Sequence, residues 1–173
     1  IVSRFGVKSL EILEQDSAQL TQIPGITEKK AQEMSESFQK QSGIRRLIEF
    51  LTMYHLPAQL AVRLYRVYGE LAQEALRDDP YLLTDAYFHA DFSQVDAFAI
   101  ELGVSADDER RVEAGALFEL SYNRGAGHTF IPQAKLRAAT CALLGLDSET
   151  IDAAMERLQE QGRMELCELA GLT

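Results

Sequence analysis

Apolar residues recur every three or four positions along most of the chain, which is the spacing of an α-helix with one buried face. Short breaks at proline and glycine separate these segments. Patterns typical of a strand occur only at 128–131 and 163–168, where the second stretch alternates polar and apolar residues. The pattern therefore predicts a mainly α protein with two short strands in its last third.

One break lies in the stretch LTQIPGITEKKAQEM, between two helix-spaced segments. Pro24 ends the first segment because proline lacks a backbone donor, and Gly25 permits a positive φ angle. Thr27 is then placed to cap the second helix. Such a helix start exposes backbone N–H groups at the positive end of the helix dipole, which favours an anion such as phosphate.

The same stretch resembles the helix-hairpin-helix motif of DNA-binding proteins. In that family the hairpin holds backbone phosphates without reading bases, and nearby basic side chains assist it. The alternative is an ordinary turn that only packs two helices together. The motif is matched at Leu20, Ile23, Pro24, Gly25, Ile26 and Ala31, whereas Thr27 replaces its second glycine.

This resemblance implies a DNA phosphate site at the first hairpin. Loop amides would contact the phosphate, and two lysines from the first turn of the next helix would add positive charge. The predicted site consists of Gly25, Ile26, Thr27, Lys29 and Lys30.

Residues 2–21 and 65–84 are two copies of one pattern at an offset of 63 positions. A further turn at Leu56-Pro57-Ala58 belongs to the second copy, and its counterpart in the first copy would precede Ile1. We therefore expect tandem hairpins in a fragment of a longer protein. The hairpin that would precede the Gly25 turn is truncated at Ile1. The coinciding positions are Gly6 and Gly69, Glu11 and Glu74, Leu13 and Leu76, Asp16 and Asp79, Leu20 and Leu83, and Thr21 and Thr84.

The second copy has a different hairpin turn, because His89, Ala90 and Asp91 stand at the positions of the first copy's glycine, isoleucine and threonine. A carboxylate would repel phosphate there. We expect this hairpin to pack rather than to bind DNA, although DNA contact remains open.

The order of predicted elements changes after Gly103. Ser105 is a predicted helix cap, and the helix it starts is followed by a short strand, two helices and a closing strand. These are the elements of a winged-helix-like domain. The predicted domains are thus 1–104, the tandem hairpin region, and 105–173, whose helix 148–162 carries four acids against Arg157 and would read a DNA groove poorly.

The net charge of −10 argues against a DNA-binding surface spread over the whole chain. Residues 1–50 are neutral, with seven basic and seven acidic side chains, and the remainder is acidic. Any DNA contact should therefore be local and salt-sensitive, and the acidic remainder is either solvated or faces a basic partner. No apolar run or signal peptide indicates a membrane, and two isolated cysteines indicate free thiols, so a cytoplasmic location is expected.

Catalytic patterns are absent from the sequence: it has no phosphate-binding loop of the G-x-x-x-x-G-K-[ST] type, no G-x-S-x-G turn and no histidine pair with metal spacing. Base-excision glycosylases also use a helix-hairpin-helix, and Asp91 or Asp96 would be the candidates for such chemistry. The glycine-poor second hairpin weakens that match. We predict no catalytic residue, cofactor or metal site in these residues.

The stretches LAVRLYRVYG, DDPYLLTDA and FSQVDAFAIELGV, with the tandem hairpins, resemble the N-terminal region of the long-type RecD-like ATP-dependent bacterial DNA helicases. That family implies superfamily-one motor domains, absent here, which use ATP and Mg²⁺ and move 5′ to 3′ on DNA. It also implies a non-catalytic region that positions single-stranded or junction DNA for those motor domains in repair or recombination, without sequence specificity. The alternative is a protein-interaction or scaffolding module.

Overall fold

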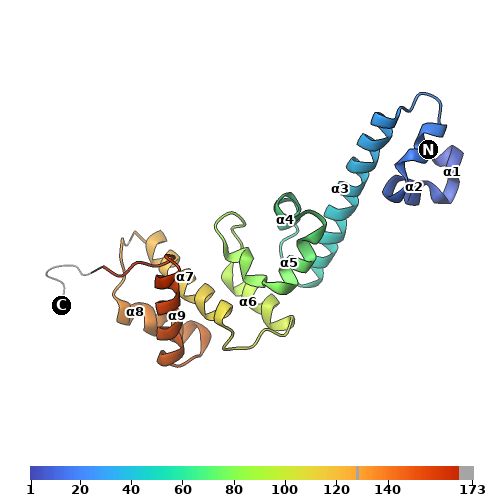
Figure 1. Cartoon of the computed structure of the whole chain (residues 1–173). Helices are drawn as coiled ribbons and strands as arrows, with labels where there is room; N and C mark the ends of the chain where they lie inside the picture. Colours follow the sequence, from blue (N-terminus) through green and yellow to red (C-terminus); the bar gives the residue numbers. More distant parts are fainter. Residues whose placement is uncertain (128, 168–173) are drawn as a thin grey trace. The chain divides into compact units, whose positions relative to one another are not determined.

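The computed structural model describes residues 1–127 and 129–167, and every regular element in that part of the chain is a helix (Figure 1). The mainly α prediction is therefore confirmed. The chain forms two compact units, Ile1–Ala75 and Leu76–Thr173. The predicted division after residue 104 falls inside the second unit and stays a prediction.

The first unit is organised around one long helix, α3. Helix α2 packs near its first turns, and α4 packs along its second half. Short 3₁₀ turns connect its smaller helices. Its elements are α1 (Val2–Phe5), η1 (Gly6–Lys8), α2 (Ser9–Gln15), η2 (Ser17–Gln22), α3 (Glu28–Met53), α4 (Leu60–Tyr68), η3 (Gly69–Leu71) and the first residues of α5 (Ala72–Asp78).

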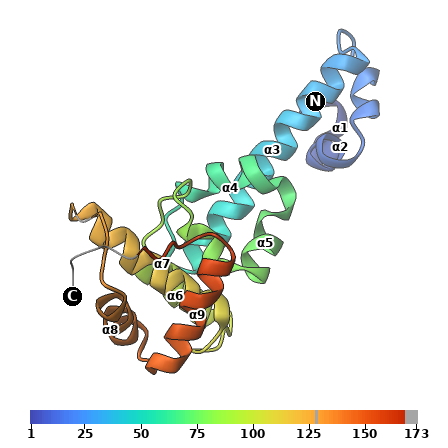
Figure 2. The same cartoon turned by 60° about the vertical axis from the view of Figure 1, so that its left-hand side comes forward.

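The second unit contains three helices that pack in pairs against one another, α7, α8 and α9, which lie together in Figure 2. A further helix, α6, packs on the turn η4 and on α7. The elements after α5 are η4 (Pro80–Thr84), α6 (Phe92–Glu101), α7 (Glu109–Gly125), α8 (Gln133–Leu144) and α9 (Ser148–Glu160).

Two apolar clusters hold the first unit together. One lies where α2, η2 and the start of α3 meet, with Ile12, Leu20 and Ala31 at its centre. Polar contacts fix the same junction, because the Ser35 hydroxyl on α3 donates to the Leu13 carbonyl at 2.6 Å. The other cluster joins the second half of α3 to α4 through the buried residues Leu47, Phe50, Leu51, Leu56, Leu60, Ala61 and Leu64.

The predicted repeat is confirmed in the backbone. The order of elements from α1 to α3 recurs from α4 to α6. Gly6, which ends α1, has φ 53° and ψ −128°, and Gly69, which ends α4, has φ 56° and ψ −133°. The Thr21 and Thr84 hydroxyls each donate to the carbonyl three residues earlier at 2.7 Å. A glycine at the bend is needed because this positive φ strains other residues.

The two strands predicted near the C-terminal end are wrong for their described residues, since 129–131 and 163–167 contain no strand. Pro132 closes the first stretch and supplies no donor for a ladder. In the second, the Arg163 and Met164 amides both donate to the Leu158 carbonyl and so complete the end of α9. Residues 128 and 168 lie outside the described residues.

Helix caps in the last third follow the prediction in part. Gly145 ends α8 in the left-handed conformation, with φ 69°, and Asp147 caps α9 by accepting from the Thr150 amide at 2.9 Å. The predicted cap at Ser105 is wrong. Asp108 caps α7 instead, because its carboxylate accepts from the Arg110 amide at 2.9 Å and also binds that arginine's side chain.

A largely buried ion pair joins α6 to α7 in the second unit. Arg111 donates to both carboxylate oxygens of Asp96, at 2.8 and 2.9 Å. The Tyr81 hydroxyl on η4 donates to the same carboxylate at 2.6 Å. Burial, followed by this hydrogen bond, raises the pKa of Tyr81. Three elements are thus tied through one aspartate.

Candidate nucleic-acid interface

The first hairpin turn has the geometry that its sequence predicts. Gly25 has φ 89°, a conformation that L side chains rarely adopt. Thr27 caps α3, and its hydroxyl accepts from the Lys30 amide at 3.3 Å. The turn therefore leads directly into a helix of 26 residues. The helix dipole places positive potential at the N-terminal end of this helix.

Several backbone donors at this helix start are exposed and unused. Within the described chain, the amides of Gly25, Thr27, Glu28 and Lys29 donate no hydrogen bond. Unpaired donors of this kind are satisfied by water or by a ligand oxygen. The Glu28 side chain lies in the first turn of α3 and offsets part of the positive potential.

Both predicted lysines lie at the surface of the first turn of α3. Lys29 is 88% exposed, and its ammonium lies 3.9 Å from the Glu33 carboxylate, one helical turn away. An exposed pair of this kind contributes little and is readily exchanged for another anion. Both lysine side chains are therefore exposed beside the helix start.

Ile26 has a different position from the other predicted residues. Its side chain is partly buried against the cluster formed by Ile12, Leu20 and Ala31, and its amide donates to the Ile23 carbonyl at 3.1 Å. It therefore anchors the turn. The structure brings Gly25, Thr27, Lys29 and Lys30 together at one exposed helix start.

In the second copy's hairpin, a side chain of the protein itself binds the backbone amides at the helix start. His89 has a positive φ of 53° at the position of Gly25. The Asp91 carboxylate accepts from the amides of Ser93 and Gln94 at 3.0 and 3.4 Å, and from the Ser93 hydroxyl. The Ser93 hydroxyl and these amides lower the pKa of Asp91. A fixed carboxylate thus occupies the place that an external phosphate would take.

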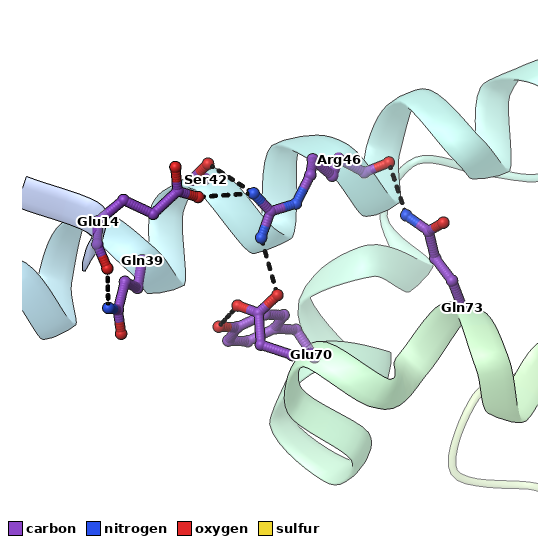
Figure 3. Close-up of polar contacts among 7 residues, drawn as sticks. Glu14, Gln39, Ser42, Arg46, Glu70 and Gln73 are labelled. Carbon is purple, nitrogen blue, oxygen red and sulfur yellow. Dashed lines mark hydrogen bonds and ion pairs between the residues drawn. The ribbon is translucent and has the colours of Figure 1, made fainter. Parts of the chain in front are cut away.

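Arg46, in the second half of α3, is held by carboxylates rather than presented to solvent anions (Figure 3). Its guanidinium donates to Glu14 at 2.9 Å and to Glu70 at 2.8 Å, and these hydrogen bonds raise its pKa. The Tyr65 hydroxyl donates to Glu70 at 2.6 Å. Burial, followed by that hydrogen bond, raises the pKa of Tyr65 to about 12. The arginine therefore ties α2 and η3 to α3.

Sequence reasoning did not single out Lys40 and Arg45, which are exposed on α3 beyond the hairpin. Their positions on the polar side of the helical pattern were the available signal. Sequence alone also could not show that the neighbouring Arg46 is neutralised by two carboxylates from other elements.

The two aspartates considered for base chemistry both have structural partners. Asp91 caps α6, and Asp96 is paired with Arg111. Among the described residues, no group of three His, Cys, Asp or Glu side chains could hold a metal ion. In that same part of the chain, no helix combines the length and apolar character required to cross a bilayer.

Comparison with known proteins places the chain in a family. Residues 39–130 match the family model described as the ATP-dependent RecD2 DNA helicase HHH domain. This chain belongs to that family. It is also 29% identical over 165 residues to the ATP-dependent RecD2 DNA helicase of Deinococcus radiodurans.

The aligned region covers 95% of this chain and 23% of the Deinococcus RecD2 helicase, so the chain spans less than a quarter of that relative. The residues that match the RecD2 HHH domain begin inside α3 and extend past the end of α7. They include the second copy's hairpin. The Gly25 turn lies outside them.

We expect Gly25→Val to lower the free energy of unfolding of the first unit by about 1–2 kcal/mol, because the left-handed region is costly for a β-branched residue. An added Cβ would meet no atom within 4 Å, so the cost would come from the backbone alone. Urea unfolding followed by circular dichroism measures it. Gly25→Asn is the matched control and should cost less, since asparagine tolerates this conformation. Equal losses of stability for Gly25→Val and Gly25→Asn would contradict the left-handed conformation assigned to Gly25.

Proposed function

We propose that this chain is a non-catalytic accessory region that binds or positions DNA for the motor of an ATP-dependent 5′ to 3′ helicase acting in repair or recombination. Membership of the RecD2 HHH domain family supports the helicase context. ATP and Mg²⁺ would bind in motor domains elsewhere in the same polypeptide. The region described here would bind and position DNA and would not itself catalyse a reaction.

The observation that carries this proposal is the start of α3. Unused amides at Gly25, Thr27, Glu28 and Lys29 surround a helix N-terminus that two exposed lysines follow. Backbone donors and ammonium groups recognise phosphate oxygens and carry no base information. We therefore propose contact with the sugar-phosphate backbone, independent of sequence, on single-stranded or junction DNA.

The charge of the two units supports a contact confined to the first. Ile1–Ala75 contains nine basic and nine acidic side chains, whereas Leu76–Thr173 contains eight basic and eighteen acidic ones. The excess negative charge of the whole chain thus belongs to the second unit. DNA would be repelled there and tolerated beside the first hairpin.

Charge reversal at Lys29 and Lys30 together tests the proposal. The parent chain should bind oligonucleotides with a Kd on the order of 10⁻⁴ to 10⁻⁶ M, and binding should weaken as salt rises. The double variant, K29E with K30E, should lose at least about tenfold in affinity and show a shallower salt dependence, because two phosphate contacts are removed. Fluorescence anisotropy with single-stranded, junction and duplex oligonucleotides measures both quantities.

The matched control reverses two exposed charges in the second unit, R124E with K135E. It alters the net charge of the chain equally but leaves the hairpin intact, so its affinity should stay within about threefold of the parent. Arg157 is unsuitable for this purpose, because it donates to the buried Glu113 carboxylate at 3.1 Å. Thermal melts should show both double variants folded.

The acidic second unit favours one other function, a protein-interaction module with little DNA affinity of its own. A basic partner, such as a motor domain, would complement its charge. If the lysine double variant binds DNA as well as the parent chain, the hairpin is a packing element. The interaction module would then be the better description.

A further inference from the structure

The two copies of the repeat differ in what covers one of their faces. In the second copy, three side chains contact the second half of α3. A Cβ added to Gly43 would lie 2.4 Å from the Tyr65 ring and 2.6 Å from the Glu70 carboxylate, so both side chains press on this glycine. The Gln73 amide donates to the Arg46 carbonyl at 3.3 Å, as Figure 3 shows.

The corresponding residues of the first copy are exposed. At an offset of 63 positions, Tyr65, Glu70 and Gln73 correspond to Val2, Val7 and Leu10. Their exposed fractions are 73%, 99% and 62%. Polar or aromatic contacts in one copy are thus replaced by three aliphatic side chains in the other.

The backbone places these three aliphatic side chains on one face. The residue before each glycine bend has nearly the same conformation, φ −112° and ψ −7° at Phe5 and φ −111° and ψ −9° at Tyr68. The residue after each 3₁₀ turn, Ser9 or Ala72, has φ −58° and ψ −38°. Val2, Val7 and Leu10 therefore share a face, as their counterparts do. Grouped, solvent-exposed aliphatic side chains are typical of a contact surface.

We propose that this face, formed by Val2, Val7 and Leu10, is the docking surface for a helix that precedes α1 in the longer polypeptide. The occupant corresponds to residues 42–53 of α3, which precede α4 in the second copy and cover its equivalent face. The aligned region covers 23% of the Deinococcus relative, so most of that relative lies outside the aligned residues.

The exposed side chains define the chemistry of this helix. Val7 stands where Glu70 binds Arg46, so this position offers no carboxylate to a guanidinium. The occupant should therefore carry an uncharged, apolar residue at the position equivalent to Arg46. Val2 is smaller than Tyr65, so the position equivalent to Gly43 is free to hold a larger residue. A second copy of this chain fits less well, because its own α3 is already covered by α4 and η3.

Cysteine accessibility tests the proposal in the full-length protein. Val7→Cys is introduced after Cys141 and Cys167, both free thiols, are replaced by alanine. The rate of maleimide labelling at this position should be on the order of tenfold slower in the full-length protein than in the 173-residue chain, since a docked helix must open first. Val7 is almost fully exposed, so the substitution should leave the shorter chain folded.

Lys8→Cys is the matched control. Its counterpart Leu71 is 64% exposed although α3 covers the neighbouring face, so Lys8→Cys should react equally fast in both proteins. Equal rates for Val7→Cys in the two proteins would overturn the proposal. Slow labelling at both positions would mean a broad cover by another domain, which also overturns it. Protection of Val7→Cys that grows with the concentration of the shorter chain would identify a second copy as the occupant instead.

Discussion

Asp96→Ala is expected to lower the free energy of unfolding of the second unit by about 3–5 kcal/mol, because it leaves a buried guanidinium without its counter-ion. Arg111 is only 8% exposed, and its two bonds to Asp96 measure 2.8 and 2.9 Å. The Tyr81 hydroxyl would lose its acceptor as well. Urea unfolding followed by circular dichroism suits a chain without tryptophan.

The matched control for this prediction is Asp152→Ala, which removes an ion pair of similar length at the surface. Arg137 donates to Asp152 at 2.6 Å, and the two side chains are 36% and 37% exposed. Its loss should cost no more than about 1 kcal/mol. Replacing both members of the buried pair, D96L with R111M, should recover much of the lost stability. Equal costs for Asp96→Ala and Asp152→Ala would contradict a structural role for the buried pair.

Gly43→Ala is expected to destabilise the first unit by about 1–3 kcal/mol, the usual cost of overpacking. A methyl group at this position would lie 2.4 Å from the Tyr65 ring. The ring cannot move freely, because its hydroxyl is bound to Glu70, which is in turn bound to Arg46. The same urea unfolding experiment measures the loss.

Gly125→Ala is the matched control, since it is the same substitution near the end of α7. A Cβ there would meet no atom within 4 Å, and alanine favours the helix, so the change should be neutral or stabilising by up to about 1 kcal/mol. Adding Tyr65→Leu to Gly43→Ala should recover part of the loss by removing the clash. If Gly43→Ala is as well tolerated as Gly125→Ala, the close approach of α3 and Tyr65 is wrong.

Local features were the most predictable from the sequence. The positive φ of Gly25, the cap at Thr27 and the left-handed end of α8 at Gly145 depend on a few neighbouring residues. The repeat was equally visible, because Gly6 and Gly69 each require the same unusual backbone angles. These preferences act within one or two helical turns, so a linear pattern contains them.

The predicted strands failed for the opposite reason. Alternation at 163–167 indicates a strand only if a partner strand is available, and the described residues offer none. The side chains of this stretch instead help to line a cavity of about 580 Å³ beside α7 and α9, together with Phe130 and Ile131. The alternation of polar and apolar residues alone did not distinguish a strand from an irregular segment that lines a cavity.

By itself, the sequence determined that the chain is helical, that it repeats, and that a glycine turn starts α3 beside two lysines. Tertiary structure alone decided which charges are available there: Arg46 is bound by Glu14 and Glu70, whereas Lys29 and Lys30 extend into solvent. The physical reason is distance along the chain. Backbone conformation is set by near neighbours, but an ion pair joins residues 24 or 32 positions apart, which only packing brings together.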